Sequence, residues 1–130
     1  MIAKINQGSG FAGAVNYVMD KKDARLVYGE GVRLKDKASI IQSFITQSKM
    51  KPNISKPVAH ISLDFSAQDK NRLTDKFMVD VAHEYLWKMG YENTQYIVVR
   101  HFDTEHPHLH LIINRIDNNG TRISDKNEKL

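Results

Sequence analysis

The chain has 130 residues, of which 41% are hydrophobic, so it is long enough to form one domain with a buried core. It contains no cysteine, which excludes disulfide bonds and thiolate metal sites. No segment approaches the length of a membrane span, so a soluble, cytoplasmic protein is expected. The net charge of +4 favours a polyanionic partner only slightly.

The first half of the chain alternates between predicted strands and helices. A short strand is expected in residues 1–6, and a glycine-rich turn leads into a helix in residues 11–22. A second strand follows in residues 24–31, and apolar residues at helical spacing predict a second helix in residues 35–50. Two prolines then interrupt the chain before the next strand.

The stretch "VAHISLDFS", residues 58–66, has the alternation of a half-covered strand. Its apolar residues would face the core, which leaves His60, Ser62 and Asp64 together on the other face. The strongest predicted helix follows in residues 73–90, with Thr74 as its N-cap and Gly90 as its end. The residues expected to form the buried stripe of this helix are Phe77, Val81, Tyr85 and Leu86.

The last third of the chain predicts antiparallel strands. Residues 94–102 and 108–116 are typical of strands, and the turn between them is too short for a parallel connection. A turn in residues 117–120 leads into a possible short strand in residues 121–124. We therefore expect an α+β fold of two layers, with a central antiparallel sheet and helices packed on one face. The other face would offer a platform for a ligand or for chemistry.

Four of the six histidines lie in "HFDTEHPHLHLII", residues 101–113. If residues 103–106 form a turn, His101 lies opposite His108 and Val99 lies opposite His110. Side chains alternate along a strand, so three imidazoles converge on one face, with facing Cβ atoms roughly 5 Å apart. This is the geometry of a three-histidine metal site with positions left open for water or a substrate oxygen. The prediction depends on register, because a slip of one residue would turn His101 to the opposite face.

Two further residues belong to this turn. Asp103 is suited to fix the tautomer of an imidazole ligand through its other nitrogen, and His106 lies in the turn itself. A divalent ion near a basic surface favours chemistry at phosphorus, which needs a nucleophile. Without cysteine, the candidates are serine, threonine, tyrosine and metal-bound water. The chain has five tyrosines, and their chemistry alone does not single out one of them.

Three stretches, in this order, resemble the relaxases, the mobilisation nucleases that nick plasmid and transposon DNA at an origin of transfer. They are "GSGFAGAVNYVMDKK", "KPVAHISLDFSAQD" and "YIVVRHFDTEHPHLHLIINRI". The third has the form H-x-D-x-x-H-x-H-x-H followed by Asn114, and the resemblance covers nearly the whole chain. It implies the fold of the HUH endonucleases. Relaxase domains generally continue beyond this motif, so residues 1–130 are expected to be the N-terminal part of a single relaxase domain, shortened at its C-terminal end.

The resemblance implies an enzyme whose tyrosine attacks single-stranded DNA and leaves a 5′-phosphotyrosine adduct and a free 3′-hydroxyl. By position, Tyr17 becomes the nucleophile, and Asp103 orients a ligand or helps to take the tyrosine proton. The metal ligands are His101, His108 and His110. The expected ion is Mg²⁺ or Mn²⁺, although imidazoles also accept Zn²⁺ or Ni²⁺. The residues expected to contact DNA are Lys21, Lys22, His60, Ser62, Arg100, His106 and Asn114.

The expected partners are single-stranded origin DNA and accessory mobilisation and coupling proteins, in the bacterial cytoplasm and without a membrane. One alternative is a replication initiator or transposase of the same nuclease class, which usually carries its tyrosine after the histidines. No tyrosine follows Tyr96 here. A second alternative is a non-catalytic nucleic-acid-binding module with a structural metal. In each case we expect metal affinity to weaken as the pH falls below about 6.5, because imidazole ligands must be neutral.

Overall fold

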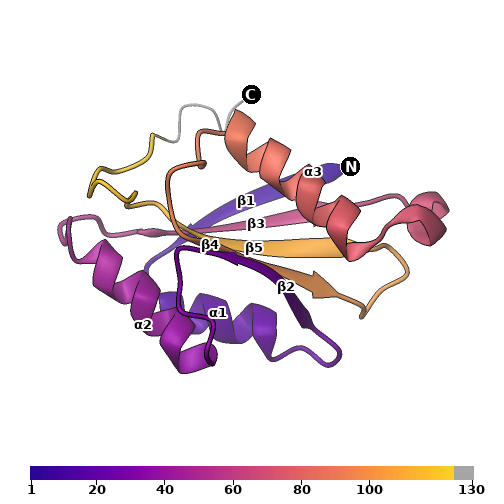
Figure 1. Cartoon of the computed structure of the whole chain (residues 1–130), viewed down its shortest axis with the longest axis horizontal. Helices are drawn as coiled ribbons and strands as arrows, with labels where there is room; N and C mark the ends of the chain where they lie inside the picture. The colour runs from indigo at the N-terminus through magenta and orange to yellow at the C-terminus, as the bar shows by residue number, and fades with distance from the viewer. Residues whose placement is uncertain (125–130) are drawn as a thin grey trace.

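Five stretches form the strands of one antiparallel sheet in the computed structural model, which describes residues 1–124 (Figure 1). The strands are β1 (Ile2–Gly8), β2 (Arg25–Glu30), β3 (Val58–Asp64), β4 (Tyr96–His101) and β5 (His108–Asn114). The helices are α1 (Phe11–Met19), α2 (Lys37–Ser48) and α3 (Asp75–Lys88), with a short 3-10 helix η1 (Ala67–Arg72) between β3 and α3.

The strand order is β1-β3-β5-β4-β2, so β5 is the central strand and the two N-terminal strands form the edges. The predicted hairpin register is confirmed, because His101 pairs with His108 and Val99 pairs with His110. On the other side of β5, Ser62 of β3 pairs with His110. Paired residues share a face, so the polar side of β3 continues the polar side of β5.

The sheet has apolar residues on both faces, and helices cover both. Helix α3 packs through Met78, Ala82 and Leu86 on one face. Helices α1 and α2 pack through Phe11 and Phe44 on the other face, where the two rings stack at 4.9 Å between centroids. Figure 1 shows this division, with α3 on one side of the sheet and α1 and α2 on the other.

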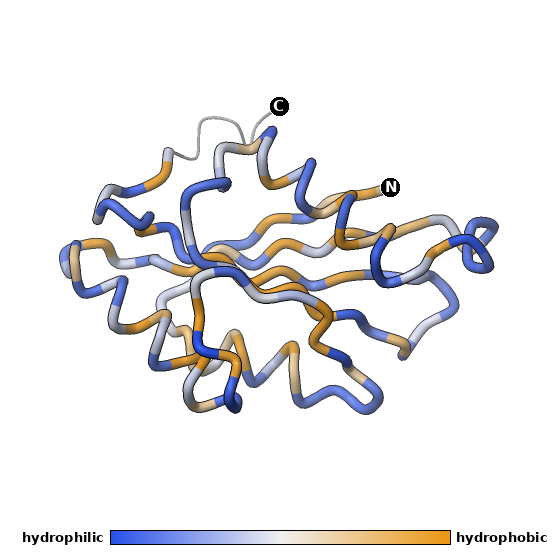
Figure 2. Tube along the Cα trace, viewed as in Figure 1, coloured by the Kyte–Doolittle hydropathy of each residue, from blue (hydrophilic) through white to orange (hydrophobic). Residues whose placement is uncertain are grey.

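The predicted α+β class and antiparallel sheet are confirmed, but the helices are not all on one face as expected. The reason is visible in β5, where Leu111, Ile112 and Ile113 are all fully buried. A continuous apolar run of this kind is typical of a strand that is covered on both sides. Figure 2 shows hydrophobic residues along the strands and mainly hydrophilic residues in η1 and in the loop from β4 to β5.

Helix α3 begins and ends where the sequence predicts. The Thr74 hydroxyl accepts a hydrogen bond from the backbone N–H of Phe77, and Gly90 follows the helix with a positive φ of 86°. The predicted buried stripe is partly wrong, because Phe77 is 51% exposed. The buried residues of α3 are Met78, Val79, Ala82 and Leu86. Within residues 1–124, no helix combines the length and apolar character that a membrane span requires.

Candidate metal centre

Three histidines of the β4–β5 hairpin point into one space. His101 ends β4, His108 begins β5, and His110 follows two residues later on the same face. One ring nitrogen from each lies within 4.8 Å of the others. This confirms that the three imidazoles converge, as the alternation of the hairpin predicts. A Zn–N bond is roughly 2.0–2.1 Å long, so small side-chain rotations would close the three nitrogens on one ion.

Burial keeps two of these imidazoles neutral. Burial and the neighbouring imidazoles lower the pKa of His110 to about 3. Burial is also the main cause that lowers the pKa of His101, and His108 adds to the effect. A neutral imidazole has one nitrogen with a free lone pair, which is the form that binds a metal ion. The donor set therefore fits a divalent cation.

Hydrogen bonds orient the outer two rings. His101 donates from Nε2 to the backbone carbonyl of Val18 at 2.7 Å, so its lone pair is on Nδ1. His108 donates from Nδ1 to the carbonyl of His106 at 3.0 Å. The Asp103 carboxylate lies 3.2 Å from Nε2 of the same ring. Asp103 therefore lies beside the His108 nitrogen that is free to bind an ion, and it is the His106 carbonyl that fixes the tautomer of this ring through the other nitrogen.

Helix α1 brings Tyr17 to this cluster. The Tyr17 ring lies edge-on to the rings of His60 and His110, with centroids 5.8 Å and 6.3 Å apart, and it is 55% exposed. The Lys21 ammonium lies 5.4 Å from the centre of the tyrosine ring. The other four tyrosines belong to the core on the α3 side of the sheet: Tyr28, Tyr85, Tyr91 and Tyr96. The fold therefore distinguishes one tyrosine, which the sequence alone did not.

A cavity of about 450 Å³ opens beside the imidazoles. Ser62 and His106, both predicted to contact DNA, line this cavity together with His108 and His110. Lys4 of β1 lines it too, because Lys4 pairs with Ser62 and so shares its face. The position of Lys4 could not be predicted from the sequence, since nothing local indicates that β1 pairs with β3. Lys21 and Lys22 are exposed just after α1, close in sequence to Tyr17.

Two residues predicted to contact DNA lie elsewhere. Asn114 is fully buried, and its side-chain amide donates to the Phe44 carbonyl and to Gln95, so a DNA contact is incompatible with its position. Arg100 is paired with Asp75 at 2.7 Å on the α3 side, and its guanidinium lies over the Phe102 ring. These contacts indicate that both residues stabilise the fold.

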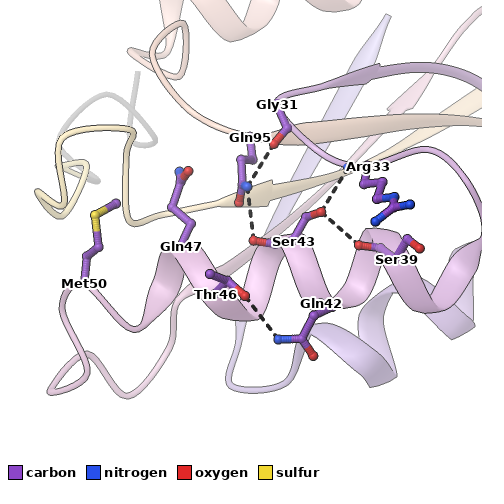
Figure 3. A pocket seen from close by; sticks show the side chains of 9 residues that line it. All are labelled: Gly31, Arg33, Ser39, Gln42, Ser43, Thr46, Gln47, Met50 and Gln95. Atoms are coloured by element: carbon purple, nitrogen blue, oxygen red, sulfur yellow. Dashed lines mark hydrogen bonds between the residues drawn. The ribbon is translucent and has the colours of Figure 1, made fainter.

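A larger cavity, of about 540 Å³, lies along α2 and is shown in Figure 3. Its polar groups bond mainly to one another. The Gln95 amide donates to the carbonyls of Gly31 and Ser43, and the Ser43 hydroxyl accepts from the backbone N–H of Arg33. These hydrogen bonds join α2 to the ends of β2 and β4. We therefore interpret the cavity as a gap between packed elements whose polar groups stabilise the fold.

The fold and the site together define an α+β protein with a histidine cluster that could hold a metal ion and a tyrosine beside it. A family model described as "Relaxase: MobA/VirD2-like, nuclease domain" matches residues 17–130. The chain therefore belongs to the MobA/VirD2-like relaxases and carries their nuclease domain, which confirms the resemblance noted above. A search of curated proteins finds no match to this chain.

Proposed function

We propose that this chain nicks single-stranded DNA at an origin of transfer, with Tyr17 as the nucleophile. The observation that carries the proposal is the position of Tyr17, which is the tyrosine that contacts the imidazole cluster. Its exposure leaves room for a DNA strand above the ring. The family match supports the same chemistry, since the match begins at Tyr17 and includes the whole histidine hairpin.

In the proposed reaction the Tyr17 hydroxyl oxygen attacks the phosphorus of a phosphodiester. A bond forms between this oxygen and phosphorus, and the bond from phosphorus to the 3′-oxygen breaks. The tyrosine loses its proton and the released 3′-oxygen gains one, so the products are a 5′-phosphotyrosine and a free 3′-hydroxyl. The phosphoester bond is retained, and the reverse attack by a 3′-hydroxyl rejoins the strand.

His101, His108 and His110 would hold the divalent ion. The chemistry that a bound ion supplies is polarisation of the scissile phosphate and stabilisation of the charge that develops on its oxygens. We propose Mg²⁺ or Mn²⁺ as the ion, and Zn²⁺ or Ni²⁺ as ions that the imidazoles also accept. For Asp103 we propose the other role that the resemblance implies, which is to help take the tyrosine proton. Its carboxylate lies 3.2 Å from Nε2 of His108, the nitrogen left free for the ion, so it does not fix that ring through the other nitrogen.

The DNA strand is proposed to cross the open face that Tyr17, Ser62 and His106 share. Lys21 and Lys22 would contact phosphates near the tyrosine, and their exposure supports this. Plasmid or transposon mobilisation then requires accessory mobilisation and coupling proteins, and a bacterial cytoplasmic location follows from that role. These partners are part of the proposal.

The test is covalent capture of DNA. A pool of single-stranded oligonucleotides of random sequence is incubated with the protein and Mn²⁺, and adducts that survive denaturing electrophoresis are sequenced. The selected oligonucleotide is then offered to Tyr17→Phe and to Tyr28→Phe, a control whose hydroxyl bonds Glu30 on the other side of the sheet. We expect Tyr17→Phe to form no adduct while its DNA affinity stays within a few-fold, and Tyr28→Phe to behave like the parent. An adduct with Tyr17→Phe would refute the assignment, and DNA binding without any adduct would favour a non-catalytic module.

A further inference from the structure

His60 lies on β3, where the sequence suggested a contact with DNA, but its ring is engaged with the metal centre. Its Nε2 lies 2.7 Å from Nδ1 of His110, which is the distance of a hydrogen bond. The register explains the contact, because Ser62 pairs with His110, and His60 is the next residue of β3 on the same face. Diagonal neighbours of this kind lie within reach of one another across an antiparallel pair.

This hydrogen bond decides which nitrogen of His110 is free. Nδ1 of His110 is occupied by His60, so only Nε2 remains to bind an ion. A neutral imidazole carries one proton, and Nε2 has a lone pair only if that proton is on Nδ1. The bond is then compatible with metal binding in one direction, in which His110 donates from Nδ1 and His60 accepts at Nε2.

We propose that His60 is a positioning residue that holds His110 in the tautomer with a free Nε2. This inference rests on the metal centre of the proposed function and adds a residue to it. His60 also lies edge-on to the Tyr17 ring, at 5.8 Å between centroids, so one side chain connects the nucleophile and a metal ligand. Hydrogen-bond partners of ligating histidines typically change metal affinity by about 10–100-fold when they are removed.

The test compares two substitutions with different hydrogen-bonding capacity. His60→Gln keeps an acceptor, because its amide oxygen can take the proton of His110 Nδ1, whereas His60→Leu removes it. His83→Leu is the matched control, because His83 is a histidine on the α3 side of the sheet, where its ring packs against Tyr28 and Tyr96. The unfolding transition of each variant is recorded first, and His60→Gln keeps the comparison valid if His60→Leu does not fold.

The first readout needs no metal. Long-range ¹H–¹⁵N NMR of the metal-free protein reports which nitrogen of His110 carries the proton. We expect the Nδ1–H form in the parent, in His60→Gln and in His83→Leu, and a mixture or the Nε2–H form in His60→Leu. An Nε2–H form in the parent, or the same tautomer in all four proteins, would overturn the proposal.

The second readout is Co²⁺ affinity by calorimetry, with the visible absorption of the bound ion. We expect His60→Leu to bind about 10–100-fold more weakly, and His60→Gln to recover most of the affinity with an unchanged spectrum. A spectrum that changes in both variants would make His60 a fourth ligand, and unchanged affinity in both would leave it as a DNA contact, so either result contradicts the inference. If the parent itself binds no Co²⁺, the metal centre of the proposed function fails, and the NMR result still decides the role of His60.

Discussion

The two faces of β5 differ in what they contact, although they belong to one seven-residue strand. Leu109, Leu111 and Ile113 are fully buried on the side of α3. His108 and His110 face the opposite side, next to Tyr17 and the open cavity. Core residues and residues of the candidate site thus alternate along residues 108–111. Neighbouring residues should therefore respond to substitution in different ways.

The largest change in stability is expected from the buried face. Leu111→Ala removes a fully buried side chain from the central strand, and such substitutions typically cost about 2–5 kcal/mol in the free energy of unfolding. Urea unfolding followed by circular dichroism measures the change. A loss below about 1 kcal/mol would show that the core beneath α3 is not closely packed.

The adjacent residue should show the opposite pattern. His110→Ala removes one of the three proposed metal ligands, so we expect Mn²⁺ affinity to fall by more than about 100-fold, beyond the loss typical of a residue that only supports a ligand. The free energy of unfolding without metal should change by less than in Leu111→Ala. Calorimetry with Mn²⁺ and urea unfolding in EDTA measure the two effects. Equal metal affinity in the parent and His110→Ala would remove this residue from the site.

The free energy of unfolding should also depend on pH through the buried histidines. Folded His110 stays neutral down to a pKa of about 3, whereas the same residue in the unfolded chain takes up a proton near the reference pKa of about 6.5. The unfolded state therefore binds more protons in this interval, and stability falls as the pH is lowered from about 6.5 toward 3. The slope is at most about 1.4 kcal/mol per pH unit for each such histidine.

Urea unfolding of the metal-free protein at several pH values measures this slope. The lowered pKa of His101 contributes in the same direction. His110→Ala should lose stability less steeply than the parent over the same interval, because one of the groups is gone. Parallel curves for the two proteins would mean that His110 is protonated in the folded state.

Basic residues on the two sides of the sheet should differ in their effect on the affinity for single-stranded DNA. Replacing both Lys21 and Lys22 with glutamine should weaken binding to single-stranded DNA and reduce the slope of log affinity against log salt by about 0.7 for each phosphate that is no longer neutralised. Arg100→Gln should leave that slope unchanged, because Arg100 is held by Asp75 on the α3 side. Fluorescence anisotropy at a series of salt concentrations measures the slopes, and a reduced slope for Arg100→Gln would restore Arg100 to the DNA surface.

The smallest effect is expected on α3, at a residue that the sequence suggested was buried. Phe77→Ala should change the free energy of unfolding by less than about 1 kcal/mol, because the ring is 51% exposed. Met78→Ala, one position later and fully buried, should cost at least about 2 kcal/mol. Urea unfolding of the two variants provides the comparison, and the reverse order would mean that α3 is rotated on the sheet.

Much of the metal site could be predicted from the sequence because it is local. A short turn joins β4 to β5, so the register follows from the hairpin, and period-two alternation then places His101, His108 and His110 on one face. The N-cap and the end of α3 were predictable for the same reason, since Thr74 and Gly90 act on neighbouring backbone groups. Local chemistry and spacing are enough for features of this kind.

The remaining assignments depended on contacts between segments that are distant in sequence. Only the docking of α1 on the sheet placed Tyr17 beside the histidines, and only the pairing of β3 with β5 brought His60 to His110. The same long-range packing buried Asn114, paired Arg100 with Asp75, and divided the helices between two faces. Which side chains share a face of the hairpin can be read from the sequence, because alternation is a property of one strand. Which residues lie opposite that face depends on the folded domain, because strand order and helix docking follow from how the whole core packs.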